Sequence, residues 1–277
     1  MTNVVDGAGR TALITGSTAG VGRALAEALA RAGTSVGVVG RDEARVAAVR
    51  ESTGGIGFVA DLSVQADVRR LAAEVTASLP QLDILVHCAA VYVNERTETP
   101  DGLETMFATN LLAPFLLSNL LRDRLVANAP ARVLVLTAPS TTKLDFNDLQ
   151  GERRFRSLTA LGASKAADLL LTFELARRWE GSGVTANAVH PGLVRTSLMR
   201  QAVAPLRWGL TLISASPERA AAAIAPLALS PEYARRSGRF FTKGREIKPP
   251  PYTRDPEVAR RLWEVSAALT GLTDGAA

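Results

Sequence analysis

The sequence is poor in cysteine, histidine and aromatic residues. One cysteine and two histidines among 277 residues exclude an internal disulfide and offer no Cys/His cluster with zinc-ligand spacing. We therefore expect no metal site and a reducing, cytoplasmic compartment. Aromatic residues make up 5% of the chain, and no basic run is interleaved with them, so we expect no nucleic-acid-binding surface.

Long hydrophobic runs are also missing. No apolar stretch reaches the roughly 20 residues that cross a bilayer, and the first ten residues lack the apolar centre of a secretion signal. The net charge of +5 comes from arginines scattered along predicted helices, a pattern typical of solvated helix faces. These features predict a soluble protein without a membrane anchor.

The chain is rich in short Val, Ile and Leu runs that alternate with longer helical stretches. This alternation predicts an α/β fold, a Rossmann-type doubly wound parallel sheet of about seven strands flanked by helices. With 47% hydrophobic residues, residues 1–277 suffice for a single domain. The predicted strands are 11–15, 35–39, 56–59, 82–86, 132–137, 185–189 and 238–246. The predicted helices include 20–32, 163–180, 217–229 and 256–269, the last after an extended Pro-Pro-Pro connector at 249–251.

A glycine-rich loop separates the first predicted strand from the first helix. Its glycines let the backbone approach a pyrophosphate, which the amino terminus of the helix attracts. The candidate ligands in this loop are Gly16, Ser17, Thr18, Gly20, Val21 and Gly22. Arg41 follows the second strand, where a guanidinium can bind a 2′-phosphate through two parallel hydrogen bonds, so we predict NADP(H) rather than NAD(H).

Segments after the other strands resemble the cofactor-binding segments of a known dinucleotide-binding family. The resemblance implies further candidate cofactor ligands at Asp61, Leu62, Cys88, Ala89, Pro191, Gly192, Val194 and Thr196. For Asp61, the alternative is that its carboxylate caps the next helix. For His87, a satisfied structural hydrogen bond is a better explanation than an acid/base role.

Together these motifs resemble the short-chain dehydrogenase/reductase family. The G-x-x-x-G-x-G spacing of residues 16–22 is typical of that family, and the Asn-x-x-His-Pro-Gly motif ending at Gly192, with Glu-Leu-Ala-Arg-Arg at 174–178, is similar to its retinol-dehydrogenase-like branch. The resemblance implies that Asp61 contacts the adenine and Thr196 the nicotinamide end of the cofactor. It also implies that Lys165 binds the nicotinamide ribose, while Asn110 kinks a helix and anchors a water beside that lysine.

The sequence departs from the family at the catalytic positions. Leu161 stands where the family has its proton-donating Tyr, four residues before Lys165, and Ala138 stands where it has Ser. A positioned acid contributes on the order of 10² to 10⁴ in rate, and Leu is no acid. Strand alternation turns Thr137 to the face opposite Ala138. At the cofactor, Ala90 replaces a family Gly, which adds a methyl group near the nucleotide.

A substrate pocket is predicted around these departures. Its candidate residues are Ala138, Ser140, Leu161, Tyr92 and Trp208. Tyr92 is the one tyrosine expected near the cleft and is a candidate for a displaced acid. Residues 193–230 are predicted to cover the substrate; the alternative for their apolar first half is a helix packed permanently on the core.

The leading functional hypothesis lets the substrate supply the missing proton. A polycyclic aromatic ketone with a neighbouring phenol carries an acid as strong as Tyr, and it needs only NADPH, an apolar slot and correct orientation. Such an enzyme would resemble the atypical ketoreductases of aromatic polyketide antibiotic pathways, such as those of simocyclinone-type angucyclinones. The alternatives are a non-redox cyclase or dehydratase, and a catalytically inactive NADP-binding protein. Ala/Leu-rich helices beginning near residues 113 and 163 predict a possible homo-oligomer interface.

Overall fold

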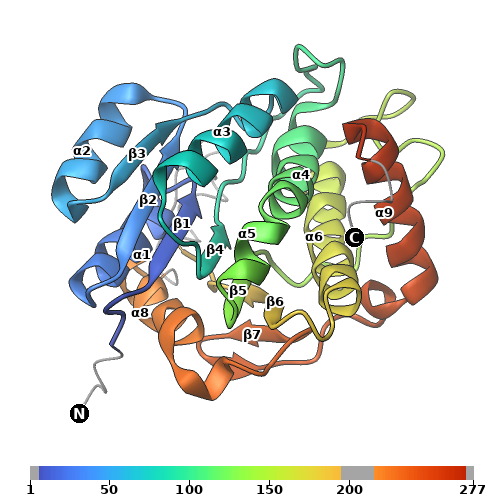
Figure 1. The fold of residues 1–277 in the computed structure, drawn as a ribbon. Coiled ribbons are helices and arrows are strands. Elements are labelled where there is room, and N and C mark those ends of the chain that lie inside the picture. Colours follow the sequence, from blue (N-terminus) through green and yellow to red (C-terminus); the bar gives the residue numbers. More distant parts are fainter. Residues whose placement is uncertain (1–5, 195–214, 273–277) are drawn as a thin grey trace.

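A computed structural model describes residues 6–194 and 215–272. Its eight-stranded sheet has the order β3-β2-β1-β4-β5-β6-β7-β8 and is parallel except for the last pair (Figure 1). The first six strands are β1 (Thr11–Thr15), β2 (Ser35–Gly40), β3 (Ile56–Val59), β4 (Ile84–His87), β5 (Ala131–Leu136) and β6 (Val184–His190). The α/β Rossmann-type prediction is confirmed.

The last predicted strand is in fact a hairpin. β7 (Phe240–Thr242) pairs with β8 (Arg245–Glu246) in antiparallel register. The two residues between them, Lys243 and Gly244, have φ angles of 48° and 75°. Two consecutive residues with positive φ give the tight turn that joins antiparallel strands, so the sheet has one strand more than predicted.

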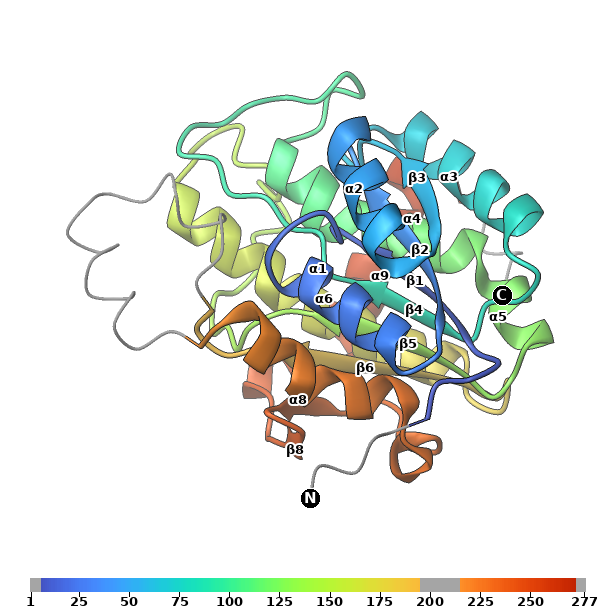
Figure 2. The same cartoon turned by 90° about the vertical axis from the view of Figure 1, so that its left-hand side faces the viewer.

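Helices cover both faces of the sheet. They are α1 (Gly20–Arg31), α2 (Glu43–Thr53), α3 (Gln65–Ser78), α4 (Ala113–Leu120), α5 (Arg122–Ala127), α6 (Ser157–Arg178), α8 (Pro217–Leu229) and α9 (Pro256–Thr270), with a π-helix, η1 (Phe107–Leu112), and the 3₁₀ turns η3 (Pro231–Tyr233) and η4 (Pro251–Arg254). Figure 2 shows α1 and α8 in front of the sheet and α6 behind it. Side chains alternate between the two cores: Leu13 packs with the α6 side, and Ala12 and Ile14 pack with the α1 and α8 side.

Two helical boundaries differ from the prediction. α6 begins at Ser157 rather than 163 and runs through Gly162, where an added Cβ would lie 2.4 Å from Thr142 Oγ1. This glycine therefore serves close packing of a loop rather than a break in the helix. The Pro-Pro-Pro connector is shorter than predicted, because Pro250 is extended but Pro251 already starts η4.

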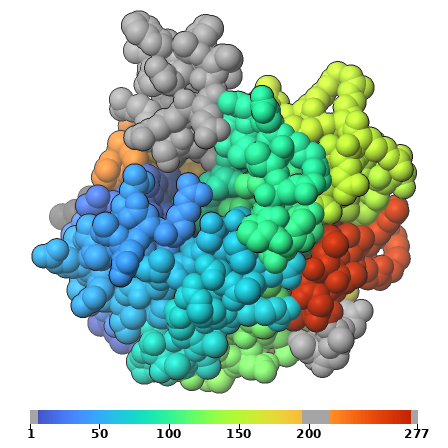
Figure 3. All heavy atoms as spheres, turned by 90° about the horizontal axis from the view of Figure 1, so that it is seen from above, coloured from blue at the N-terminus to red at the C-terminus, as the bar shows by residue number. Residues whose placement is uncertain are grey.

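α9 covers the outer face of α4 and α6. The ring of Trp263 meets that of Phe115 edge-on at 4.8 Å, and the Arg178 guanidinium lies 4.4 Å from the Trp263 ring centre. In Figure 3 the red surface of α9 borders the yellow-green surface of the segment that leads into α6. The face predicted to join two subunits is thus packed against a helix of the same chain; the oligomer itself stays a prediction.

Arg70 covers part of the edge strand β3. Ile56 and Val59 on this strand are 39% and 38% exposed. The guanidinium of Arg70, on α3, donates two hydrogen bonds to the Val59 carbonyl oxygen, at 3.1 and 3.2 Å.

Within the described part of the chain, none of the helices combines the length and the apolar character that spanning a membrane requires.

Candidate active site and cofactor cleft

Most of the predicted site residues within the described segments lie in or beside the loops where the parallel strands end. Loops after β1, β4, β5 and β6 share one edge of the sheet, because neighbouring parallel strands end side by side. Close packing between two of these loops needs glycine: a Cβ on Gly16 would lie 2.6 Å from Ala89 Cα. The loop from β1 to α1 therefore lies directly against the segment that follows β4.

The loop between β1 and α1 has the features of a phosphate cradle. Gly16 and Gly20 have positive φ, and a Cβ on Gly22 would come within 2.4 Å of the Gly16 carbonyl oxygen. Ala19 precedes α1 without a side-chain cap, and the first turn carries no acidic residue. The amide groups of that turn thus remain available for an anion, so the loop fits a dinucleotide pyrophosphate.

Some residues predicted to bind the cofactor use their side chains within the fold. The fully buried Ser17 hydroxyl donates to the Ile14 oxygen at 2.8 Å and accepts from the Val39 amide at 2.9 Å, which ties β1 to β2. Val21 lies in the α1 core, and Leu62 packs against the other core. Thr18 packs on Gly40, because a Cβ added to Gly40 would lie 2.4 Å from the methyl group of Thr18. At Ser17, Val21 and Leu62, the backbone rather than the side chain remains available to contact a cofactor.

The two candidate adenosine ligands lie after β2 and β3. Arg41 is exposed directly after β2, where its guanidinium is free to meet a phosphate group. Asp61 accepts from both the amide and the hydroxyl of Ser63, at 2.9 and 2.7 Å. The residue that precedes α3 in the capping position is Val64, so Asp61 closes a turn and does not cap the helix.

The segment after β4 is held by hydrogen bonds that exclude acid/base roles. His87 Nε2 lies 2.8 Å from Ser118 Oγ on α4, and complete burial lowers the pKa of His87 to about 3, so the ring is neutral. This agrees with the structural role preferred from the sequence. The Cys88 and Ala89 amides donate to Thr15 Oγ1, and burial raises the pKa of the Cys88 thiol to about 12 despite the opposing charge of Lys165.

Lys165 has a carboxylate partner that sequence reasoning missed. Its ammonium donates to Asp168 Oδ2 at 2.9 Å, and the Asp168 side chain is only 3% exposed. Burial raises the pKa of Asp168, while Lys165 and the Thr137 hydroxyl oppose that shift. The signal was the i, i+3 spacing, which places both charged groups on one helix face.

Thr137 faces α6, on the side of the sheet that Val133 and Val135 share, as strand alternation predicts. β5 ends at Leu136, but the Thr137 amide still donates to the Val189 oxygen at 2.9 Å, so the alternation continues one residue further. The Thr137 hydroxyl donates to the main-chain oxygen of Lys165 at 3.1 Å. It thereby joins the end of β5 to the turn of α6 that carries Lys165.

Asn110 lies in the π-helix η1, as its predicted helix-kinking role requires. The side chain accepts from the Val91 amide at 2.8 Å and donates to the Val91 oxygen at 3.0 Å. It also donates to Ser164 Oγ at 3.3 Å, next to Lys165 in sequence. Asn110 therefore fastens the segment after β4 against α6, and its predicted role in holding a water stays a prediction.

The predicted substrate residues line up along the first half of α6. Leu161 is partly buried one turn before Lys165. Ser140, two residues after the partly buried Ala138, donates to the Gly162 oxygen at 2.7 Å. The Tyr92 hydroxyl donates to Ser157 Oγ at 3.0 Å, two turns and about 12 Å along the helix from Lys165.

The loop after β6 is described only at its two ends. Pro191 precedes Gly192, which has a φ of 85°, and Val194 bridges to Ala215. The predicted ligand Thr196 and the predicted pocket residue Trp208 lie outside the described residues. Of the covering segment 193–230, α8 belongs to the core, where Ile224 and Leu227 pack with α1.

Comparison with known proteins identifies this arrangement. The short chain dehydrogenase family model matches residues 10–206. The chain belongs to the short-chain dehydrogenase/reductase family. It is 38% identical to human retinol dehydrogenase 13 over 95% of this chain and 85% of that protein. A dehydrogenase/reductase from Sinorhizobium meliloti aligns with a TM-score of 0.71 and 26% identity, over 87% of this chain and 95% of the other.

This short-chain dehydrogenase/reductase is therefore an oxidoreductase by family, and the family binds nicotinamide cofactors. A related crystal structure from Beutenbergia cavernae, provisionally assigned as an NAD(P)-dependent gluconate 5-dehydrogenase, contains NADP; it aligns with a TM-score of 0.68 and 28% identity over 86% of this chain and 96% of the other. The glycine cradle and uncapped α1 fit such a cofactor. The likeness to the retinol dehydrogenases confirms the branch predicted from the sequence motifs.

Proposed function

We propose that this protein is an NADPH-dependent ketoreductase for polycyclic aromatic ketones whose own neighbouring phenol supplies the proton. The observation that carries the proposal is the placement of all three tyrosines away from Lys165. Tyr92 bonds Ser157, Tyr233 donates to the Gly244 oxygen at 3.1 Å, and Tyr252 accepts from the Leu144 amide at 3.0 Å. No phenol of the chain thus stands beside the lysine.

The other hydroxyl, thiol and imidazole groups near Lys165 in the described segments are weak acids or already engaged, and the Asp168 carboxylate is ion-paired with the lysine itself. Thr137 and Ser140 donate to carbonyl oxygens of α6. The thiol of Cys88, with its pKa near 12, holds its proton too firmly, and His87 is a buried neutral ring bonded to Ser118. A substrate phenol, with a pKa of about 10, is as strong an acid as the missing Tyr.

The chain's residues then have three tasks. Leu161 and Ala138 provide an apolar wall that accepts a flat ring system and limits water. Lys165, held by Asp168, places positive charge near the phenolate that forms when the phenol gives its proton to the carbonyl oxygen. When bound, NADPH supplies the hydride; Arg41 would meet its 2′-phosphate, and the loop at residues 16–22 its pyrophosphate.

The test is NADPH binding by fluorescence titration, followed by stopped-flow oxidation of NADPH with matched ketones. Ketones with a phenol ortho or peri to the carbonyl should oxidise NADPH, and their O-methyl ethers should not. Equal rates with both would place the acid in the protein. Binding without oxidation of any ketone would favour the cyclase or dehydratase alternative or an inactive NADP-binding protein, and absence of binding would refute the reductase proposal.

A second test concerns Tyr92 as the displaced acid. We expect Tyr92→Phe to keep kcat within about twofold, because its hydroxyl lies two helical turns from Lys165. Tyr252→Phe removes a hydroxyl of similar burial elsewhere and serves as the control. A loss of about a hundredfold in Tyr92→Phe alone, the size of a missing general acid, would make Tyr92 the proton donor.

The wider setting follows from the same chemistry. Phenolic polycyclic ketones are typical of aromatic polyketide antibiotic pathways, so we propose a biosynthetic role there. A cytoplasmic location suits the single cysteine, Cys88.

A further inference from the structure

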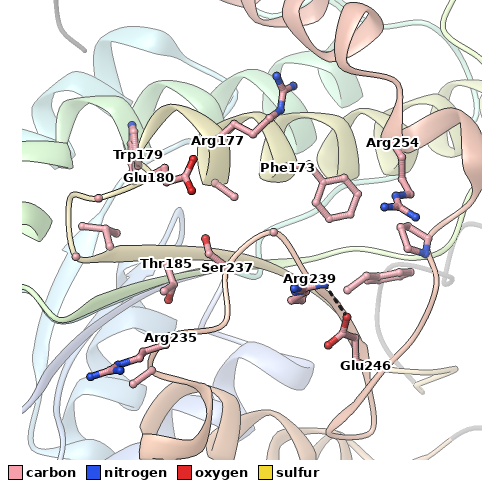
Figure 4. A pocket seen from close by; sticks show the side chains of 18 of the residues that line it. Phe173, Arg177, Trp179, Glu180, Thr185, Arg235, Ser237, Arg239, Glu246 and Arg254 are labelled. Atoms are coloured by element: carbon pink, nitrogen blue, oxygen red, sulfur yellow. Dashed lines mark hydrogen bonds and ion pairs between the residues drawn. The ribbon is translucent and has the colours of Figure 1, made fainter.

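A large cavity lies at the opposite end of the sheet from the cofactor cleft. Its volume is about 1140 Å³, and it follows the sheet edge between the second half of α6 and the β7–β8 hairpin (Figure 4). Thr185, at the start of β6, lines it. Thr185 precedes His190 by five residues, about 17 Å of extended strand. The cavity is therefore separate from the edge where the cofactor is expected.

The floor of the cavity is apolar. Leu169, Ala188 and Phe240 form a small buried cluster apart from the two main cores, and Phe173 and Ile247 pack against it while partly exposed. Phe173, Phe240 and Ile247 also line the cavity, into which Figure 4 shows Phe173 pointing from α6. The chain thus leaves one side of this cluster uncovered, as a binding site for an apolar group would require.

The rim of the cavity is basic. Its charged side chains are Arg177, Arg235, Arg239, Lys248 and Arg254, against Glu180 and Glu246. Glu246 pairs with Arg239 at 3.3 Å, and Arg177 pairs with Glu174 outside the cavity. Within residues 6–194 and 215–272, no carboxylate pairs with Arg235, Lys248 or Arg254, and all three are exposed. In the same ranges, the three remaining cations face one unpaired carboxylate, Glu180, so the rim carries an excess of two positive charges and favours an anion.

A buried hydroxyl on the cavity wall lacks a partner. Thr185 is 8% exposed, and its Oγ1 makes no hydrogen bond within the described structure. Figure 4 places Thr185 on the same side of β6 as Arg235. Side chains alternate along β6, so the Thr185 hydroxyl lies on the face of the sheet opposite Ala188 and the apolar floor and does not serve a ligand bound there.

We propose that this cavity binds an organic anion with an apolar body. The apolar body lies on Phe173, Phe240 and Ile247, and a carboxylate, sulfonate or phosphate group meets the unpaired basic side chains of the rim. Arg254, which Figure 4 shows beside Phe173, joins the basic rim to the apolar floor. The site goes beyond the proposed ketone reduction and does not depend on it.

The test uses 8-anilinonaphthalene-1-sulfonate, an aromatic body with one sulfonate, added to the full-length protein with saturating NADP⁺ to block the cofactor cleft. We expect saturable fluorescence enhancement. Arg254→Glu and Lys248→Glu should each weaken binding by about tenfold, the usual scale for a hydrogen bond to a charged group. Arg50→Glu, an exposed position on α2 at the far side of the sheet, makes the same change of net charge and should leave the affinity unchanged.

Three outcomes would overturn the proposal. These are absence of binding with NADP⁺ present, unchanged affinity in both rim variants, and equal affinity for neutral N-phenyl-1-naphthylamine, which has the same aromatic body without the sulfonate. Thermal unfolding of each variant establishes that it is folded. If NADP⁺ fails to bind, the proposed function fails, but the comparison of rim and control variants still decides this site.

Discussion

Single side chains set the chemistry that this protein can perform. Lys165 shares α6 with two residues of opposite effect: Leu161 removes an acid one turn earlier, and Asp168 adds a carboxylate 2.9 Å from the ammonium. The ammonium group of a lysine without a partner would become ordered only when a cofactor binds. Here its charge is held in place beforehand, which reduces the cost of ordering it during reaction.

Arg41 should determine the preference between the two nicotinamide dinucleotides. We expect Arg41→Asp to reduce the preference for NADPH over NADH by about 10- to 100-fold, because a hydrogen bond to a charged group contributes roughly 1.5–3 kcal/mol. Michaelis constants for both cofactors measure this change. Arg50→Asp alters the same charge elsewhere and should change neither constant; an unchanged preference in Arg41→Asp would remove the assignment to the 2′-phosphate.

His87 should make the protein less stable in acid. Burial depresses its pKa from 6.5 to about 3, so the stabilising neutral form is fully present above pH 6.5 and its contribution is lost as pH falls towards 3. At about 1.4 kcal/mol per pH unit, this group alone removes roughly 2–3 kcal/mol between pH 6.5 and 4.5. Urea unfolding at both pH values should show a smaller loss for His87→Asn, and equal losses would contradict the burial argument.

At the scale of elements, the positions of the strands were more predictable than the junctions. Val/Ile-rich runs indicated the strands because buried parallel strands need apolar residues on both faces. The hairpin at Lys243–Gly244 was missed, since Lys at positive φ is uncommon and gives no signal. In the site, glycine spacing indicated the phosphate loop. The Asp168 partner was missed although its i, i+3 spacing from Lys165 is a local signal, whereas the Tyr92 bond to Ser157 depends on packing between distant segments, which local patterns do not encode.

α9 should contribute strongly to stability through one aromatic residue. Trp263 is 5% exposed and packs between Phe115 and Arg178. We expect Trp263→Ala to lower the free energy of unfolding by about 3–5 kcal/mol, the usual cost of removing a buried large aromatic side chain. Leu269→Ala on the same helix, at a residue 36% exposed, is the control and should cost far less. Urea denaturation gives both values; similar losses would mean that α9 is not docked through Trp263.

At the scale of the whole molecule, the two ends of the sheet carry different sites. The carboxyl ends of the strands form the cofactor cleft, and the opposite end of β6 forms the cavity with the basic rim. The two are linked by α6, which carries Lys165 in its first half and Phe173 in its second. A ligand in the cavity therefore contacts the helix that positions the lysine.

The arginine of α3 that bonds the edge strand β3 affects how the protein behaves on heating. An unpaired parallel edge strand with apolar side chains is a template on which a second chain can add, and such growth leads to precipitation. Arg70 occupies the Val59 carbonyl that this growth would use, and its ion pairs with Asp67 and Glu74 bring charged groups to the same place. We expect Arg70→Ala to aggregate faster by light scattering just below its melting temperature, while Arg50→Ala on α2 behaves as the parent protein does. One side chain on a neighbouring helix would then decide whether partly unfolded molecules refold or are lost as aggregates.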